Sequence, residues 1–259
     1  MKCVIFAGGK GNRIKTENNH TPKPLVKIGN EPIIWHIMKC YSYYGVKDFI
    51  ICLGYEQLEF KKYFIDLMNK NQDIQLDFKN KKINSLNNHN EDWNIILVDT
   101  GLETLTGARL KRVEKYLDEK DESFFLTYAD AVSDVNIKEL YNYHKKSNKL
   151  ATITVVKKKE RFGVVELDDS SVKKFREKNV KNDEWINAGF MVVNKKVLSY
   201  LNENSTTFEK EILERLTDEN ELAAYKHNGF WQCMDYQSER ELLDNLLRKG
   251  EAKWKVWDK

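Results

Sequence analysis

The first 70 residues alternate short apolar runs with stretches of helical periodicity, and this alternation limits the fold more than any other feature. An apolar run at 2–6 ends at a Gly-rich turn, and a second apolar run follows at 47–53. Between them, apolar side chains recur at helical spacing from Pro32, which suits the first turn of a helix, to Gly45. The order strand, loop, helix, strand, helix is typical of a βαβ unit with parallel strands.

The rest of the chain repeats this alternation, with a polar insertion at 69–94 and a hairpin near 162–175. We therefore predict an α/β fold with a Rossmann-like, mixed and mostly parallel sheet flanked by helices. No internal repeat and no clean linker appears, so one domain is expected. Further strands are predicted at 74–78, 94–98, 123–128, 151–156 and 186–193, and further helices at 58–68, 106–117, 137–144, 209–216 and 238–247.

Charge and cysteine content exclude several classes of function. The 43 basic and 40 acidic residues leave a net charge of +3, whereas nucleic-acid-binding proteins carry a larger, clustered basic excess. The four cysteines form no C-x-x-C pair, and no Cys/His cluster has zinc spacing. Without a secretory signal or a run of roughly 20 apolar residues, the chain is expected in the reducing cytoplasm, with no membrane and no nucleic-acid partner.

A Gly-rich loop follows the first apolar run and consists of Gly8, Gly9, Lys10, Gly11, Asn12 and Arg13. Glycines let a backbone come close to a ligand, and consecutive N–H groups can cradle phosphate, to which Arg13 would add a cation. The loop matches neither the P-loop pattern nor the G-x-G-x-x-G dinucleotide fingerprint. A tight turn with a solvated arginine would carry the same residues, so the loop by itself leaves phosphate binding open.

Three charged residues stand in unusual settings. Lys23 is enclosed by Pro22 and Pro24, which stiffen the backbone, and a held lysine can stabilise a charged transition state. Asp130 follows a strand, where a carboxylate can hold Mg²⁺, and Asp235 is a lone acid in an aromatic segment. Each aspartate has an alternative role as a helix N-cap.

A further aspartate bears on that alternative. Asp134 lies just before the helix predicted at 137–144 and is the better N-cap candidate for it. This favours ligand binding for Asp130 and leaves both of its roles open.

Together these features resemble the sugar-phosphate nucleotidyltransferase family. The loop at 8–13 is similar to its G-G-x-G-x-R signature, and Lys23 stands where its P-K-P lysine belongs. Within the family the chain resembles the glucose-1-phosphate cytidylyltransferase branch, in collinear order over almost its whole length. The segments that carry this resemblance are 35–39, 48–52, 98–101, 106–113, 161–163, 177–178, 186–190, 229–232, 234–235 and 254–257.

The resemblance implies a nucleotide-diphospho-sugar transferase fold and an Mg²⁺-dependent transfer from CTP to a sugar 1-phosphate, foremost α-D-glucose 1-phosphate. Arg13 and Lys23 would be catalytic, and Asp130 and Asp235 would hold the Mg²⁺. The nucleotide would lie among Phe6, Ala7, Gly8, Gly9, Lys10, Gly11, Asn12, Thr100, Gly101, Thr106, Gly107 and Arg109, and the phosphorylated acceptor among Tyr128, Gly163, Glu177, Lys178, Asn187 and Gly189.

The resemblance also implies two halves and an assembly. The single domain over 1–259 would have a nucleotide-binding half at 1–135 and an acceptor-binding half at 136–259. The assembly would be a homo-oligomer, with the hexamer as the form that the resemblance implies.

Four positions depart from the branch. Ala129, Ala131 and Ala188 stand where it carries glycines, and Asn179 stands where it carries proline. All four lie near the expected acceptor site, so a cytidylyltransferase with a different phosphorylated acceptor is an alternative. A non-catalytic, nucleotide-binding regulatory paralogue is a second alternative, against which the intact Lys23 and the two aspartates argue.

Overall fold

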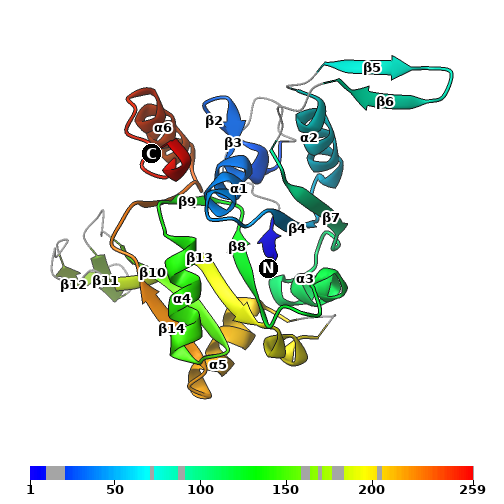
Figure 1. The fold of residues 1–259 in the computed structure, drawn as a ribbon. Coiled ribbons are helices and arrows are strands. Elements are labelled where there is room, and N and C mark those ends of the chain that lie inside the picture. Colours follow the sequence, from blue (N-terminus) through cyan, green and yellow to red (C-terminus); the bar gives the residue numbers. More distant parts are fainter. Residues whose placement is uncertain are drawn as a thin grey trace.

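The structure is a computed structural model that describes residues 1–9, 21–70, 73–86, 91–158, 164–168, 171–176, 184–202 and 206–258. Its centre is a seven-stranded sheet in the order β14-β10-β13-β8-β1-β4-β7 (Figure 1). The strands are β1 Cys3–Phe6, β4 Asp48–Leu53, β7 Asn94–Asp99, β8 Ser123–Tyr128, β10 Ala151–Lys158, β13 Glu184–Asn194 and β14 Leu222–Lys226.

Most neighbouring strands of this sheet run parallel. β1 pairs in parallel with β4 and β8, β4 with β7, and β10 with β14. Only β13 is reversed within the sheet, because it pairs antiparallel with both β8 and β10. The prediction of a mixed, mostly parallel sheet is therefore confirmed. The carboxyl ends of β1, β4, β7 and β8 share one edge with the amino end of β13.

Helices cover both faces of the sheet. They are α1 Ile33–Tyr43, α2 Gln57–Lys70, α3 Thr106–Val113, α4 Ile137–Ser147, α5 Glu214–Asp218 and α6 Gln237–Arg248. Shorter turns are η1 Lys23–Leu25, η2 Glu114–Tyr116, η3 Lys195–Tyr200 and η5 Val256–Asp258, and the π-helix η4 covers Phe208–Leu213. The helix predicted at 209–216 is thus a π-turn that continues as α5, and the one predicted at 106–117 ends in a 3₁₀ turn.

Alternate residues of β1 point into two separate cores, as expected for a strand buried on both faces. Cys3 and Ile5 pack with α1, α2, α4 and α6, whereas Val4 and Phe6 pack with α3, η3, η4 and α5. The continuous apolar runs seen in the sequence follow from this double burial.

Four short antiparallel pairs accompany the main sheet. They are β2 Lys27–Ile28 with β3 Glu31–Pro32, β5 Ile74–Asp77 with β6 Lys82–Ser85, β9 Ala131–Ser133 with β15 Trp231–Cys233, and β11 Val164–Asp168 with β12 Ser171–Arg176. The last pair confirms the hairpin expected near 162–175, and the polar insertion holds the hairpin β5–β6. Figure 1 shows this hairpin standing out from the body beyond α2.

The helix cap expected at Asp134 is wrong. Helix α4 begins at Ile137, and the Asn136 side chain accepts a hydrogen bond from the backbone N–H of Glu139 at 3.0 Å. Asp134 lies two residues before this N-cap. Its carboxylate instead accepts from the backbone N–H of Phe230 at 2.7 Å and contacts His227.

All four cysteines are free thiols, and Cys3, Cys40 and Cys52 are buried. Burial raises the pKa of Cys40 and of Cys52 to about 12. Over the described ranges, no helix is both long and apolar enough to cross a membrane.

Candidate active site

Lys23 joins two aspartates that are far apart in the sequence. Its Nζ donates to Asp130 Oδ2 at 2.8 Å and to Asp235 Oδ1 at 2.6 Å. The lysine sits in η1 directly after Pro22, whose carbonyl accepts from the N–H of Leu25 at 2.8 Å and closes the turn. The side chain is held in one place, because its backbone is constrained by the turn and its ammonium by two carboxylates.

A short antiparallel ladder brings the two aspartates together. Asp130 follows β8 directly, and Asp235 follows β15. Ala131 in β9 pairs with Cys233 in β15, and the N–H of Met234 donates to the carbonyl of Asp130 at 2.8 Å. The residues beside each aspartate are therefore hydrogen-bonded to one another, which fixes the spacing of the carboxylates.

The electrostatics of this cluster favour a cation between the carboxylates. Burial alone would lower the pKa of Lys23, but the charges and hydrogen bonds of Asp130 and Asp235 raise it above the usual value of 10.5. The lysine side chain is 10% exposed, and those of Asp130 and Asp235 are 39% and 27% exposed. The carboxylates can thus be reached from outside while the ammonium is largely covered.

The donor set fits a divalent cation that takes its remaining ligands from water and phosphate. Two carboxylates already surround a cationic group, and Mg²⁺ in phosphate-transfer sites is commonly bound through one or two carboxylates. In the described part of the chain, neither this site nor any other holds a group of three or more His, Cys, Asp or Glu side chains arranged to hold a metal ion. A metal ion at this site would therefore take most of its ligands from outside these two aspartates.

The helix-capping alternative for both aspartates is excluded. The backbone N–H groups of Asp235 and Tyr236, just before α6, donate to the Glu239 carboxylate at 2.6 and 3.1 Å. The N-cap of α6 is therefore Tyr236, which forms a capping box with Glu239, and not Asp235. Asp130 is followed by the strand β9, not by a helix.

Arg109 acts as a clamp beneath the Gly-rich loop. Its guanidinium is buried and donates to the carbonyls of Leu53, Gly8 and Leu102 at 2.9, 3.2 and 3.1 Å, and to the Thr100 hydroxyl at 2.7 Å. A side chain at Gly8 would collide with this guanidinium. The arginine thus holds the ends of β1 and β4 and the turn after β7 in one arrangement.

The described members of the set assigned to the nucleotide lie around this clamp or next to it. Phe6 and Ala7 are buried, and Thr100 is fully buried, with its hydroxyl donating to the carbonyl of Leu53 at 2.6 Å. Gly101 has φ +87° and donates its N–H to Asp99 at 2.9 Å. The structure therefore gathers this set at the carboxyl edge of the sheet, where ligands bind in open α/β folds. Lys10, Gly11, Asn12 and Arg13 lie outside the described residues.

On the acceptor side, the structure brings Tyr128 and Gly189 into contact. Gly189 has φ +82°, and a Cβ there would press against the Tyr128 ring. The N–H of Gly189 donates to the Asn187 side chain at 2.9 Å, so the backbone in the middle of β13, where the register with β10 shifts, is hydrogen-bonded in place. Gly163, Glu177 and Lys178 lie outside the described residues, as does Asn179.

The three alanines that depart from the family pattern are buried. Ala129 and Ala188 are each 2% exposed and Ala131 is 6% exposed. Their methyl groups therefore offer an acceptor very little surface.

Sequence reasoning missed one residue of this region, Glu209 in η4. Its carboxylate accepts from the Tyr128 hydroxyl at 2.5 Å and from the Thr106 hydroxyl at 2.6 Å. The sequence indicated only a helix at this position, because its partners lie 81 and 103 residues away. Gly107, next to Thr106, is close to the same segment, since a Cβ there would lie 2.7 Å from the Thr206 carbonyl.

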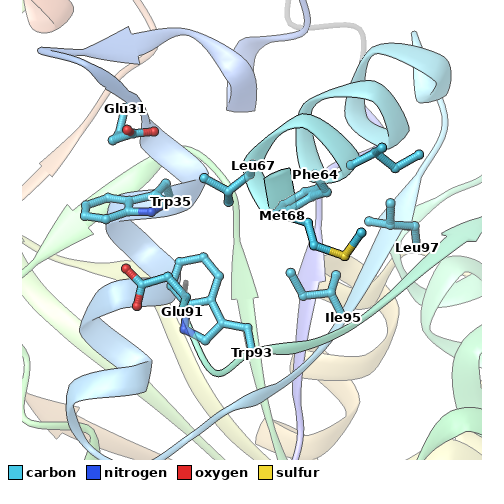
Figure 2. Close-up of a pocket in the computed structure, with 10 residues that line it drawn as sticks. Glu31, Trp35, Phe64, Leu67, Met68, Glu91, Trp93, Ile95 and Leu97 are labelled. Carbon is cyan, nitrogen blue, oxygen red and sulfur yellow. The ribbon is translucent and has the colours of Figure 1, made fainter. Parts of the chain in front are cut away.

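A separate apolar pocket lies between α1, α2 and β7 and has a volume of about 340 Å³. Figure 2 shows Trp35, Phe64 and Trp93 among its walls, with Glu31 and Glu91 beside them. None of the described candidate residues lines it. This cavity is therefore separate from the candidate active site around Lys23.

A held lysine between two carboxylates, beside a Gly-rich turn at the carboxyl edge of a mostly parallel sheet, defines an enzyme that handles nucleotide phosphates. The family model described as Nucleotidyl transferase matches residues 2–235, and the chain belongs to this family. The prediction of a nucleotidyltransferase is confirmed. Enzymes of this family typically use a divalent metal ion.

Several relatives match over their whole length. A glucose-1-phosphate cytidylyltransferase of Salmonella typhi is 42% identical over 258 residues, which cover 100% of both chains. A probable glucose-1-phosphate cytidylyltransferase of Bacillus subtilis is 40% identical, covering 99% of this chain and 100% of the relative. The crystal structure of HddC from Yersinia pseudotuberculosis, 22% identical, has a TM-score of 0.66 over 95% of this chain and 99% of that one, which shows the fold alone.

Proposed function

We propose that this chain is a cytidylyltransferase that converts CTP and α-D-glucose 1-phosphate to CDP-glucose and pyrophosphate. The observation that carries the proposal is the cluster of Lys23, Asp130 and Asp235 in a chain 42% identical, from end to end, to a protein named for this activity. Each of the three charged groups has a use in phosphate transfer. A regulatory paralogue without catalysis would have no need to keep all three.

The reaction needs no protein nucleophile, because the phosphate of the acceptor is already an anion. One of its oxygens attacks the α-phosphorus of CTP in line, a P–O bond forms, and the bond to the β-phosphate bridging oxygen breaks to release pyrophosphate. The chain then contributes position and charge. Lys23 would donate to the oxygens around the α-phosphorus, and Arg13 with the Gly-rich loop would bind the triphosphate.

Asp130 and Asp235 would hold Mg²⁺, the finer assignment within the divalent-metal requirement of the family. When bound, Mg²⁺ would neutralise phosphate charge and bind phosphate oxygens. Lys23, which now occupies the space between these carboxylates, would then be free to turn toward the phosphates. The other residues that the resemblance assigns to the nucleotide and to the acceptor are proposed for the same roles in this chain.

A matrix of four nucleoside triphosphates against a panel of sugar 1-phosphates, read by pyrophosphate release, tests the proposal. We expect the highest kcat/KM for CTP with glucose 1-phosphate. Turnover of CTP with another phosphorylated acceptor alone would support the alternative that the departures at 129, 131, 179 and 188 suggest. CTP binding without turnover of any acceptor would support the regulatory paralogue and reject the proposal.

We further propose that the chain acts as a cytoplasmic homo-oligomer. Leu76 and Ile83 face each other across the hairpin β5–β6 and are 52% and 62% exposed, and Phe78 at its turn is 85% exposed. A lone two-stranded hairpin is marginally stable in water, and clustered exposed apolar side chains mark contact surfaces. Sedimentation velocity should show an assembly that the double variant Leu76→Ser, Ile83→Ser weakens. A wild-type monomer at micromolar concentration would reject this.

A further inference from the structure

The carboxylate of Glu209 connects the two halves of the candidate site. Tyr128, at the end of β8, is assigned to the acceptor by the resemblance, and Thr106, at the start of α3, is assigned to the nucleotide. Each hydroxyl donates to a different oxygen of Glu209, at 2.5 and 2.6 Å. Both donors are uncharged, and no cation among the described residues forms an ion pair with Glu209, so its carboxylate is a strong acceptor that orients both hydroxyls.

The backbone around Glu209 is anchored so that this geometry is reproducible. The backbone N–H of Phe208 donates to the Thr106 hydroxyl at 2.9 Å, and that of Ala108 donates to the Thr206 carbonyl at 3.1 Å. The Phe208 side chain is fully buried and lies edge-on to Phe6, with ring centroids 6.3 Å apart. The start of η4 is thus tied to the first turn of α3, and Glu209 can span from there to Tyr128.

Tyr128 is held on its other sides as well. Its ring lies 6.0 Å from that of Phe6 and directly beneath Gly189, where any side chain would collide with it. Burial and the nearby charge of Glu209 raise the pKa of Tyr128, so the phenol keeps its proton at neutral pH. With that proton directed to Glu209, the phenol oxygen presents its lone pairs toward other groups.

We propose that Glu209 is a positioning residue that directs the Tyr128 proton to itself, so that the Tyr128 oxygen accepts a hydrogen bond from one hydroxyl of the sugar phosphate. This inference rests on the proposed function, because it assigns the acceptor side of that same site. It explains why a carboxylate and not an amide stands in η4. An amide would present a donor to one of two hydroxyls that both need an acceptor.

The test compares Glu209→Gln, Tyr128→Phe and the double variant with the wild type, using CTP and glucose 1-phosphate. We expect each single variant to raise the KM for glucose 1-phosphate about tenfold and to leave the KM for CTP within about twofold. The double variant should be no worse than either single variant, since both changes remove the same interaction. Glu211→Gln is the matched control, because Glu211 lies in the same helix and, among the described residues, its carboxylate accepts only from the N–H of Thr207.

Monodeoxy analogues of glucose 1-phosphate give a readout that a purely structural role would not change. The wild type should discriminate about tenfold against one analogue, and Glu209→Gln and Tyr128→Phe should both lose that discrimination. Equal discrimination in Glu209→Gln and the wild type would overturn the inference. So would additive losses in the double variant, or a Glu209→Gln variant that lowers Tm without changing either KM.

Failure of the proposed function has a different signature. If the wild type turns over CTP only with another acceptor, the same comparison is made with that acceptor. If it turns over none, calorimetric titration with glucose 1-phosphate replaces kinetics. Equal binding by the wild type and Glu209→Gln, or no binding by either, then overturns the role of Glu209.

Discussion

The guanidinium of Arg109 donates to the carbonyl of Gly8 at 3.2 Å, although 101 residues separate the two in the chain. This contact places a buried positive charge directly under the first turn of the Gly-rich loop. The resemblance assigned Arg109 to the nucleotide, whereas its four hydrogen-bond acceptors are protein atoms. We infer that Arg109 shapes the loop against which the triphosphate would lie.

Gly8→Ala should destabilise the protein, because the added methyl group would collide with the Arg109 guanidinium. Arg109→Lys should also destabilise it, since one ammonium cannot reach the carbonyls of Leu53, Gly8 and Leu102 together. We expect each variant to lose about 1–3 kcal/mol of unfolding free energy. Urea denaturation measures this, and Gly9→Ala, where an added Cβ meets no atom within 4 Å, is the matched control. Equal stability of Gly8→Ala and Gly9→Ala would contradict the clamp.

Lys23→Ala should lower kcat by roughly 10²–10³ while the fold persists, because one preorganised charge at the reacting phosphate is lost. Pyrophosphate release gives kcat, and circular dichroism reports the fold. Lys27→Ala, four residues on and exposed in β2, is the matched control and should retain normal turnover. Near-normal kcat for Lys23→Ala would remove Lys23 from the reaction.

Asp130→Asn and Asp235→Asn should each raise the Mg²⁺ concentration needed for half-maximal activity, because a neutral amide binds a divalent cation less strongly than a carboxylate. We expect a shift of about tenfold or more, by analogy with losses at metal-supporting groups. A chelator should abolish turnover of the wild type, and added Mg²⁺ should restore it. An unchanged Mg²⁺ dependence in both variants would show that the metal binds elsewhere.

The raised pKa of Lys23 makes its contribution to stability depend on pH. In the folded state the two aspartates hold this pKa above its usual value of 10.5. The contribution is therefore fully present below the unfolded pKa and is lost as pH rises through the folded pKa. The difference in unfolding free energy between the wild type and Lys23→Met should stay constant from pH 7 to about 10 and shrink above that. A difference that grows with alkaline pH would contradict the ion-pair geometry.

The buried thiols should react slowly in the native protein. Burial raises the pKa of Cys40 and Cys52 to about 12 and that of Cys233, which is only partly buried, to about 11. At pH 8 the reactive thiolate of Cys40 or Cys52 is therefore depleted about a thousandfold relative to a thiol of ordinary pKa. Alkylation followed by mass spectrometry should label Cys233 first and all four cysteines only after denaturation. Rapid labelling of Cys52 in the folded protein would be inconsistent with this core.

The layers of this fold could be predicted from the sequence, because strands buried on both faces require continuous apolar runs. The runs that became β1 and β4 are apolar at nearly every position, as parallel strands between two helical layers require. The direction of β13 could not be predicted in the same way. An apolar run is the same whichever way the chain passes through the sheet, and only pairing with β8 and β10 sets its direction.

The candidate site, too, could be predicted only in part from the sequence. Lys23, Asp130 and Asp235 were identified by residue type and local pattern, but their meeting depends on contacts across 107 and 212 residues. Arg109 was identified, but its burial was not, since a charged residue on a helix is normally exposed. Glu209 had no local signal at all, because one glutamate in a predicted helix resembles any other.

Because Phe208–Leu213 forms a π-helix, the position of Glu209 depends on the number of residues in this segment. Each hydrogen bond of a π-helix spans one more residue than in an α-helix, so deletion of a single residue within η4 would let the segment relax into an α-helix. The glutamate would then rotate away from Tyr128 and Thr106, although every side chain of the network remained in the sequence. Scanning by substitution would not detect this dependence, whereas scanning by single-residue deletion would.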